Sequence, residues 1–239
     1  MIAADPRGRA RLLLLACGLF LVAAPVRAEI GASLTFASQD RFRGYSVSDG
    51  HPAATLSLSY DDADGPYVEG SVMASGTPSE GVHRFRFEGN AGYALRLKKG
   101  PTIDAGIVHA DYSGYRIYGY KVSYTEVYVG LITGNVAAHL HYAPNYFQRG
   151  VRTIYSDVQG SIPLTPHIRL NAHYGLLFQT HGIREQAGRT TRDWRIGAST
   201  AIDKLNFELA VASGVKKRSF YGEAKDGGTA LLFAVTAVF

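Results

Sequence analysis

Apolar and polar residues alternate with a period of two through most of the chain after residue 28. Between residues 192 and 202, for example, Trp194 and Ile196 share one face, whereas Asp193 and Arg195 share the other. Successive side chains of a β-strand point to opposite sides, and no 3.6-residue apolar period persists, so the pattern predicts an all-β chain. A soluble β-sandwich and a membrane β-barrel both produce such alternation, and a second feature must separate them.

The connections between the predicted strands supply that feature, because their lengths differ systematically. The predicted strands are Gly31–Ser38, Pro52–Tyr60, Pro66–Ala74, Val82–Lys98, Thr102–Ala110, Val122–Thr133, Asn135–Ala143, Val151–Leu164, His167–Phe178, Thr190–Ile202, Leu205–Ser213 and Gly228–Phe239. Short connections fall at residues 61–65, 99–101, 134, 165–166 and 203–204, and the clearest long ones at 39–51, 111–121, 179–189 and 214–227. Short turns at one end, long loops at the other and both termini beside the short turns are typical of outer-membrane proteins. The sequence therefore predicts an all-β fold, a transmembrane antiparallel up-and-down β-barrel of about 12 strands.

The last predicted strand is apolar on one face and ends on an aromatic residue, Phe239. Residues 230–238 carry no charge. Chain ends usually fray, so a strand this apolar needs a hydrogen-bonded partner, and in a closed barrel that partner is the first strand. A terminal aromatic strand also makes the barrel-insertion machinery an expected partner.

The first 28 residues have the pattern of a secretory signal peptide. Arg7, Arg9 and Arg11 precede an apolar run at residues 12–24, and Ala28 provides a small residue at the cleavage position. The run is shorter than the roughly 20 residues that a spanning helix needs. We therefore expect residues 1–28 to be a signal peptide, cleaved after use by the secretion machinery. Residues 29–239 then form a barrel in the outer membrane of a Gram-negative cell.

Composition restricts the function of the cleaved chain. The one cysteine, Cys17, lies in the signal peptide, so the remaining 211 residues offer no thiolate for catalysis or metal binding. Loss of four arginines and Asp5 lowers the net charge from +5 to +2. The remaining basic residues alternate with apolar ones rather than forming a stripe, so nucleic acid is not an expected partner.

Aromatic residues concentrate near the ends of the predicted strands. Tyr60, Tyr93 and Phe239 lie toward the short turns. A larger group lies toward the long loops: Phe42, Tyr45, Tyr112, Tyr115, Tyr118, Tyr120, Tyr142, Tyr146, Phe147, Tyr155, Phe178 and Trp194. Membrane barrels carry aromatic belts at both lipid interfaces, and we interpret the two groups as these belts.

Three groups of residues form a recognisable pattern. They are Phe42-Arg43-Gly44 with Ser46, Ser48-Asp49-Gly50 and Pro52-Ala53; Tyr124 with Glu126–Leu131; and Pro144–Phe147. The pattern resembles the proteobacterial porins of the TorF family, and the resemblance spans nearly all of the chain after residue 28. It implies an outer-membrane β-barrel of porin type. It implies no particular solute, because the family name is itself an inference.

Polar residues at inward-facing positions define the candidate path of a solute. Seven charged residues are predicted to line or constrict it: Arg43, Arg84, Arg86, Glu88, Glu126, Asp193 and Arg195. The inward positions carry both charge signs in similar number, which favours a narrow, weakly selective channel for passive diffusion of small polar or charged solutes. The first loop either folds into the lumen, with Arg43 toward an anionic solute, or caps the rim on lipopolysaccharide phosphates or internal carboxylates. No catalysis and no cofactor are required.

A metal site is a further possibility for the inward face. His139 and His141 lie two residues apart on one strand face, and His167 and His173 point inward from another strand. Nothing in the sequence fixes a third ligand or its supporting groups. Polar residues of the lumen wall therefore account for these histidines more simply, and no metal is predicted.

Two other functions stay open. His109 faces lipid with Ser113 and Ser123 nearby, as in a lipid-hydrolysing barrel, although no acid or nucleophile motif accompanies it. A closed barrel could instead act through its outer loops. Residues 214–227 favour that alternative, because they are basic and aromatic and suit a lipopolysaccharide surface.

Overall fold

A computed structural model describes residues 28–98, 100–117, 120–182, 190–213 and 228–239. Its strands are β1 (Glu29–Ala37), β2 (Arg41–Phe42), β3 (Tyr45–Ser46), β4 (Ala53–Asp61), β5 (Pro66–Thr77), β6 (Gly81–Arg96), β7 (Thr102–Ile117), β8 (Tyr120–Thr133), β9 (Val136–Ala143), β10 (Arg152–Pro163), β11 (Ile168–His181), β12 (Thr190–Ile202), β13 (Leu205–Ala212) and β14 (Ala230–Val238). The predicted signal peptide lies outside the described residues, apart from residue 28.

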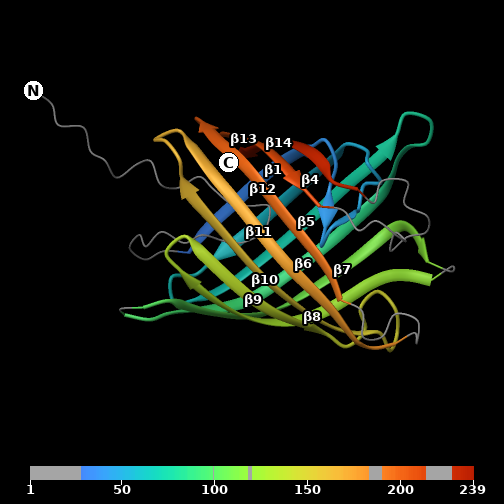
Figure 1. Ribbon diagram of the computed structural model, residues 1–239, viewed down its shortest axis with the longest axis horizontal. Coiled ribbons are helices and arrows are strands. Elements are labelled where there is room, and N and C mark those ends of the chain that lie inside the picture. Colours follow the sequence, from blue (N-terminus) through green and yellow to red (C-terminus); the bar gives the residue numbers. More distant parts are fainter. Residues whose placement is uncertain (1–27, 99, 118–119, 183–189, 214–227) are drawn as a thin grey trace, which may run out of the picture.

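Twelve of these strands close into one antiparallel barrel, in which consecutive strands from β4 to β14 are neighbours (Figure 1). β1 completes the barrel, because it pairs with both β4 and β14. At the seam Ser33 lies opposite Val238, and the Phe239 amide donates a hydrogen bond to the Ala32 carbonyl at 2.9 Å. The predicted up-and-down barrel is confirmed, and its closure leaves no open strand edge in a bilayer.

The outward face of the barrel is apolar and the inward face is polar. Along β8, Val127, Val129 and Leu131 are each about half exposed, whereas Tyr124 and Glu126 are buried. Large exposed apolar side chains occur on every strand of the barrel. A soluble sandwich would bury this apolar face, so the arrangement is that of a membrane barrel. Among the described residues, no helix is long and apolar enough to cross a membrane.

Two connections differ from the prediction. The expected long loop at residues 111–121 is wrong, because β7 continues to Ile117 and β8 begins at Tyr120. β6 and β7 reach 16 residues each, more than the roughly 9–11 that cross a bilayer. The connection between β5 and β6 spans only residues 78–80, so this end also carries a short turn. Residues 183–189 and 214–227, from the predicted outer loops, lie outside the described residues.

Candidate functional site

The first connection of the barrel forms a hairpin rather than an irregular loop. β2 and β3 pair across the turn Arg43-Gly44, where φ is 48° and 81°. A tight two-residue hairpin turn requires positive φ at both positions, which suits Gly44 but is unusual for Arg43. At the base of the hairpin the Val47 amide donates to the Asp40 carbonyl at 2.8 Å. We call residues 40–48 the inner hairpin.

The base of the inner hairpin is attached to two parts of the barrel wall. Arg41 Nη1 donates to the carbonyls of Ser213 and Gly228, next to the outer ends of β13 and β14, at 3.1 Å each. The Asp40 carboxylate forms an ion pair with Arg86 of β6 at 2.9 Å. These contacts hold the hairpin across the outer part of the lumen.

The tip of the inner hairpin is anchored to a third part of the wall. Arg43 Nη2 donates to both carboxylate oxygens of Glu126 on β8, at 2.7 and 2.9 Å. Its guanidinium lies 3.9 Å from the ring centre of Tyr155 and 4.7 Å from that of Phe42. Burial disfavours the positive charge, but Glu126 and the nearby tyrosines outweigh this and hold the pKa of Arg43 well above its usual value. The first loop therefore folds into the lumen, and Arg43 binds an internal carboxylate there.

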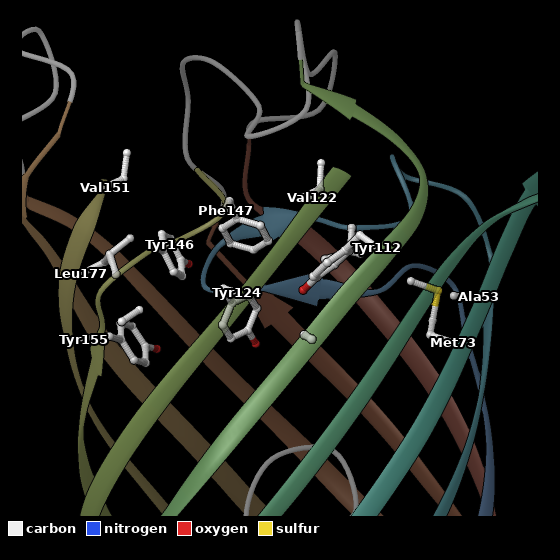
Figure 2. Close-up of a cluster of buried hydrophobic side chains, with 13 residues drawn as sticks. Ala53, Met73, Tyr112, Val122, Tyr124, Tyr146, Phe147, Val151, Tyr155 and Leu177 are labelled. Atoms are coloured by element: carbon white, nitrogen blue, oxygen red, sulfur yellow. The ribbon is translucent and has the colours of Figure 1, made fainter. Parts of the chain in front are cut away.

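Four aromatic side chains fill the lumen beside Arg43, and Figure 2 shows them pointing inward from the barrel wall and from the connection after β9. They are Tyr112, Tyr124, Tyr146 and Phe147, which we call the aromatic cluster. The ring centres of Tyr146 and Phe147 lie 4.5 Å apart, and those of Tyr124 and Phe147 lie 5.0 Å apart. Each residue is 4% exposed or less, so this part of the lumen excludes water.

The predicted outer lipid belt is therefore wrong in part. Five of its members point into the lumen: Phe42, Tyr112, Tyr146, Phe147 and Tyr155. The inward direction of two of these residues could have been predicted from the sequence. Tyr112 is an even number of residues from Asp104, and Tyr155 is two residues from Asp157. Each tyrosine therefore shares a strand face with an inward acid. Phe178 is exposed, as the belt requires. The side chains of residues 115–121 lie outside the described part.

The three predicted site residues on β6 contact the inner hairpin or one another. Arg86 lies 2.9 Å from Asp40 and 3.9 Å from Glu88. Arg84 Nη2 donates to the Asp49 carboxylate, just beyond the hairpin, at 3.2 Å. The ion pairs of Asp40 and Asp49 could not be read from the sequence, because they depend on how the first connection folds back into the barrel.

The remaining predicted site residues, Asp193 and Arg195, lie on β12; Asp193 is buried, whereas Arg195 faces a wetter part of the lumen. His173 Nε2 is 2.9 Å from Asp193 Oδ1, and Arg195 Nη2 is 2.8 Å from Glu208 Oε1. The side chains of Arg195 and Glu88 are 32% and 31% exposed although both point into the closed barrel. Their exposure therefore measures access to water inside the lumen. We call His173, Arg195 and Glu208, on β11 to β13, the wet face; Glu88 lies on β6, on the opposite side of the barrel.

Two of the four histidines predicted to face inward share one acid of the neighbouring strand. His141 Nε2 lies 3.3 Å from Asp157 Oδ2, and His139 Nδ1 lies 3.6 Å from Asp157 Oδ1. Asp157 of β10 stands directly opposite His139 of β9. His173 lies apart in the wet face, and His167 is an exposed residue of the turn before β11. The sequence pairs the two histidines correctly but does not reveal the acid between them.

The arrangement needed for lipid hydrolysis is not found around His109. Its Nδ1 lies 2.8 Å from the Thr125 hydroxyl on the lipid-facing surface. Ser123 stands opposite Asp111, two residue pairs further along the same two strands. Within the described residues, no hydrogen bond joins His109 to a serine, so an activated nucleophile is not formed there.

Comparisons with known proteins agree with this architecture. A family model described as a bacterial protein of unknown function, Gcw_chp, matches residues 23–236. The curated proteins contain no match. Among solved structures, the NanC porin aligns with a TM-score of 0.57 and 10% identity over 88% of this chain and 98% of its own. The KdgM porin aligns with a TM-score of 0.52 and 14% identity over 87% and 99%. The shared fold is that of outer-membrane porins, and the barrel described above is an outer-membrane protein.

Proposed function

The chain belongs to the Gcw_chp family of bacterial proteins, and we propose that it is a narrow outer-membrane channel for passive diffusion of small polar or charged solutes. Arg195 of the wet face and Glu88 on the opposite wall carry the proposal, because both point into a closed barrel and yet stay about one third exposed. A lumen filled by its own side chains would leave such charges buried. The porin fold and the resemblance to the TorF family support the same function.

In this proposal the inner hairpin narrows the outer opening. Arg43, Glu126 and the aromatic cluster fill the side of the lumen formed by β7 to β10. Solutes would pass beside the hairpin, between Arg195 of the wet face and Glu88 on the opposite wall, which carry opposite charges. Opposite charges across a narrow path give weak ionic selectivity and favour small dipolar solutes.

The proposal assigns no catalytic step and no cofactor to the protein. Its partners are the small solutes in the lumen, lipid around the apolar band and lipopolysaccharide at the outer rim. The secretion and barrel-insertion machineries are the partners expected during assembly.

Cysteine substitution tests the path, because the mature chain has no cysteine of its own. We expect Glu88→Cys and Arg195→Cys channels in planar bilayers to lose conductance when a charged, water-soluble thiol reagent is added. Val129→Cys is the matched control, because Val129 faces lipid and no lumenal water reaches it. Its conductance should not change.

Absence of ionic current from the unsubstituted protein in planar bilayers would contradict the proposed channel. The protein must first be shown to be folded, by the heat-dependent change in gel migration that closed barrels display. A folded barrel without current would favour the closed alternative, which the dry aromatic cluster also supports and which would act through its outer loops.

A further inference from the structure

We propose that His139, His141 and Asp157 form a lumenal binding site for one divalent transition-metal ion of the zinc class. The two histidines share the inward face of β9, and the acid comes from β10. One potential ligand atom from each residue lies within 4.8 Å of the others. This site is separate from the proposed solute path, so its occupancy does not depend on whether the barrel conducts.

The distances between ligand atoms are close to those of a tetrahedral site. With bonds of about 2.0–2.2 Å, two ligands of a tetrahedral zinc ion stand about 3.4 Å apart. The two observed histidine–carboxylate separations are 3.3 and 3.6 Å, from His141 and His139 to the two oxygens of Asp157. Small side-chain rotations would therefore bring three ligands onto one ion. The fourth position would remain open for water.

Each histidine also has an acid near its second ring nitrogen. His141 Nδ1 is 3.0 Å from Glu126 Oε1, and His139 Nε2 is 3.9 Å from Asp104 Oδ2. An acid at the second nitrogen of a ligating histidine orients the ring and fixes the proton there, which leaves the first nitrogen free for the metal. Glu126 is in turn held by Arg43. Glu126 is therefore placed to support His141, whereas Asp104 would have to approach His139 more closely to support it in the same way.

The charges around the histidines favour a cation. Asp104, Glu126 and Asp157 carry three negative charges when ionised, and Arg43 returns one positive charge through its ion pair with Glu126. If both histidines were neutral, two negative charges would stay uncompensated. Glu126 is buried in this part of the lumen, and burying uncompensated charge costs free energy. A divalent ion removes that imbalance. Two protons on the histidines would do the same, so protons and metal should compete.

The local backbone leaves room for the ligating ring of His139. Gly130 of β8 stands opposite His139, and a side chain at Gly130 would overlap the imidazole. The rings of Tyr128 on β8 and Tyr155 on β10 flank His141, with ring centres 5.3 and 5.8 Å from its own. Imidazole and carboxylate ligands together suit zinc, cobalt, nickel and copper ions, whereas magnesium prefers oxygen ligands alone.

Cobalt provides the direct test, because tetrahedral Co²⁺ absorbs visible light strongly and octahedral aqueous Co²⁺ does so weakly. We would titrate Co²⁺ into the folded, tag-free mature protein and then displace it with Zn²⁺. The expected result is one ion per chain with a tetrahedral spectrum that zinc abolishes and magnesium does not. Affinity should fall as the pH is lowered, because histidine binds metal only when it is deprotonated.

Matched variants identify the ligands. His139→Ala, His141→Ala and Asp157→Asn should each weaken cobalt binding by more than about tenfold, the lower bound for loss of a supporting group. His109→Ala should bind as the unsubstituted protein does, because His109 lies on the lipid face. Heat-dependent gel migration must show that every variant is folded. Absence of a tetrahedral spectrum in the folded protein, or cobalt affinity in the three ligand variants equal to that of the unsubstituted protein, would overturn the site.

Discussion

Arg43 has a backbone conformation that suits glycine, and its side chain neutralises an acid inside the lumen. Its φ of 48° lies in the left-handed region, which is unfavourable for residues with a Cβ and least so for asparagine. Its guanidinium neutralises the buried carboxylate of Glu126 and stacks on Tyr155. The ion pair, rather than the turn, therefore explains why an arginine occupies this position.

The substitution Arg43→Asn separates the two contributions, because asparagine tolerates the turn but carries no charge. Glu126 would then remain buried without its main cation, so the free energy of unfolding should fall by about 3–5 kcal/mol. Denaturant unfolding of the barrel in lipid vesicles measures this change. Trp194, the one tryptophan of the chain, provides the fluorescence signal.

A double variant controls for effects unrelated to the ion pair. Arg43→Asn combined with Glu126→Gln removes both charges and should cost less than the sum of the two single substitutions. If the decreases in the free energy of unfolding are strictly additive, or if Arg43→Asn alone lowers it by less than about 1 kcal/mol, the ion pair contributes little to stability.

At this scale the sequence predicts which way a residue points more reliably than what it contacts. Glu126, Asp193 and Arg195 alternate with apolar residues, so their inward direction follows from strand geometry. Asp40 and Asp49 belong to a connection without any periodic pattern. Their pairing with Arg86 and Arg84 arises only when that connection folds into the barrel.

At the scale of strands, alternation is informative only where one face meets lipid. Residues 111–117 extend β7 beyond the length that a bilayer requires, and there the outward face also carries polar residues such as Asp111 and Ser113. The pattern is lost, so the sequence indicates a loop where the chain continues as a strand. β2 and β3, of two residues each, are too short for any periodicity to show.

Replacement of the hairpin tip tests whether the inner hairpin narrows the channel. Residues 41–46 can be exchanged for Gly-Gly, because Asp40 and Val47 are already joined by a backbone hydrogen bond, and a two-residue turn closes such a pair. The change removes Phe42 and Arg43 from the lumen. We expect single-channel conductance to increase, measured in planar bilayers.

The control for this conductance measurement is a variant that keeps the inner hairpin but changes another residue in the connection between β1 and β4. Asp49→Asn serves this purpose, because it loses only an exposed ion pair with Arg84 and leaves residues 41–46 in place. Its conductance should stay close to that of the unsubstituted protein. Equal conductance of the Gly-Gly variant and the unsubstituted protein would mean that the hairpin does not set the width of the path.

At the scale of the whole molecule, closure depends on the backbone of the last strand and much less on its terminal side chain. β14 pairs with β1 through five consecutive residue pairs, and the Phe239 amide donates to Ala32. The Phe239 ring, by contrast, lies outside the strand pairing and is 69% exposed. A role in recognition during assembly explains an aromatic residue there better than a role in stability.

Phe239→Ala distinguishes these roles. The substitution keeps the backbone hydrogen bond, so the free energy of unfolding in detergent should change by no more than about 0.5 kcal/mol, as for other surface positions. We propose that the insertion machinery recognises this aromatic residue, so in cells the same variant should reach the outer membrane in smaller amounts. Quantitative blotting of outer-membrane fractions measures this, with Leu231→Ala as a control that changes lipid contact on the same strand. Normal membrane levels of Phe239→Ala would contradict recognition, and a large loss of stability in detergent would assign the ring to barrel closure instead.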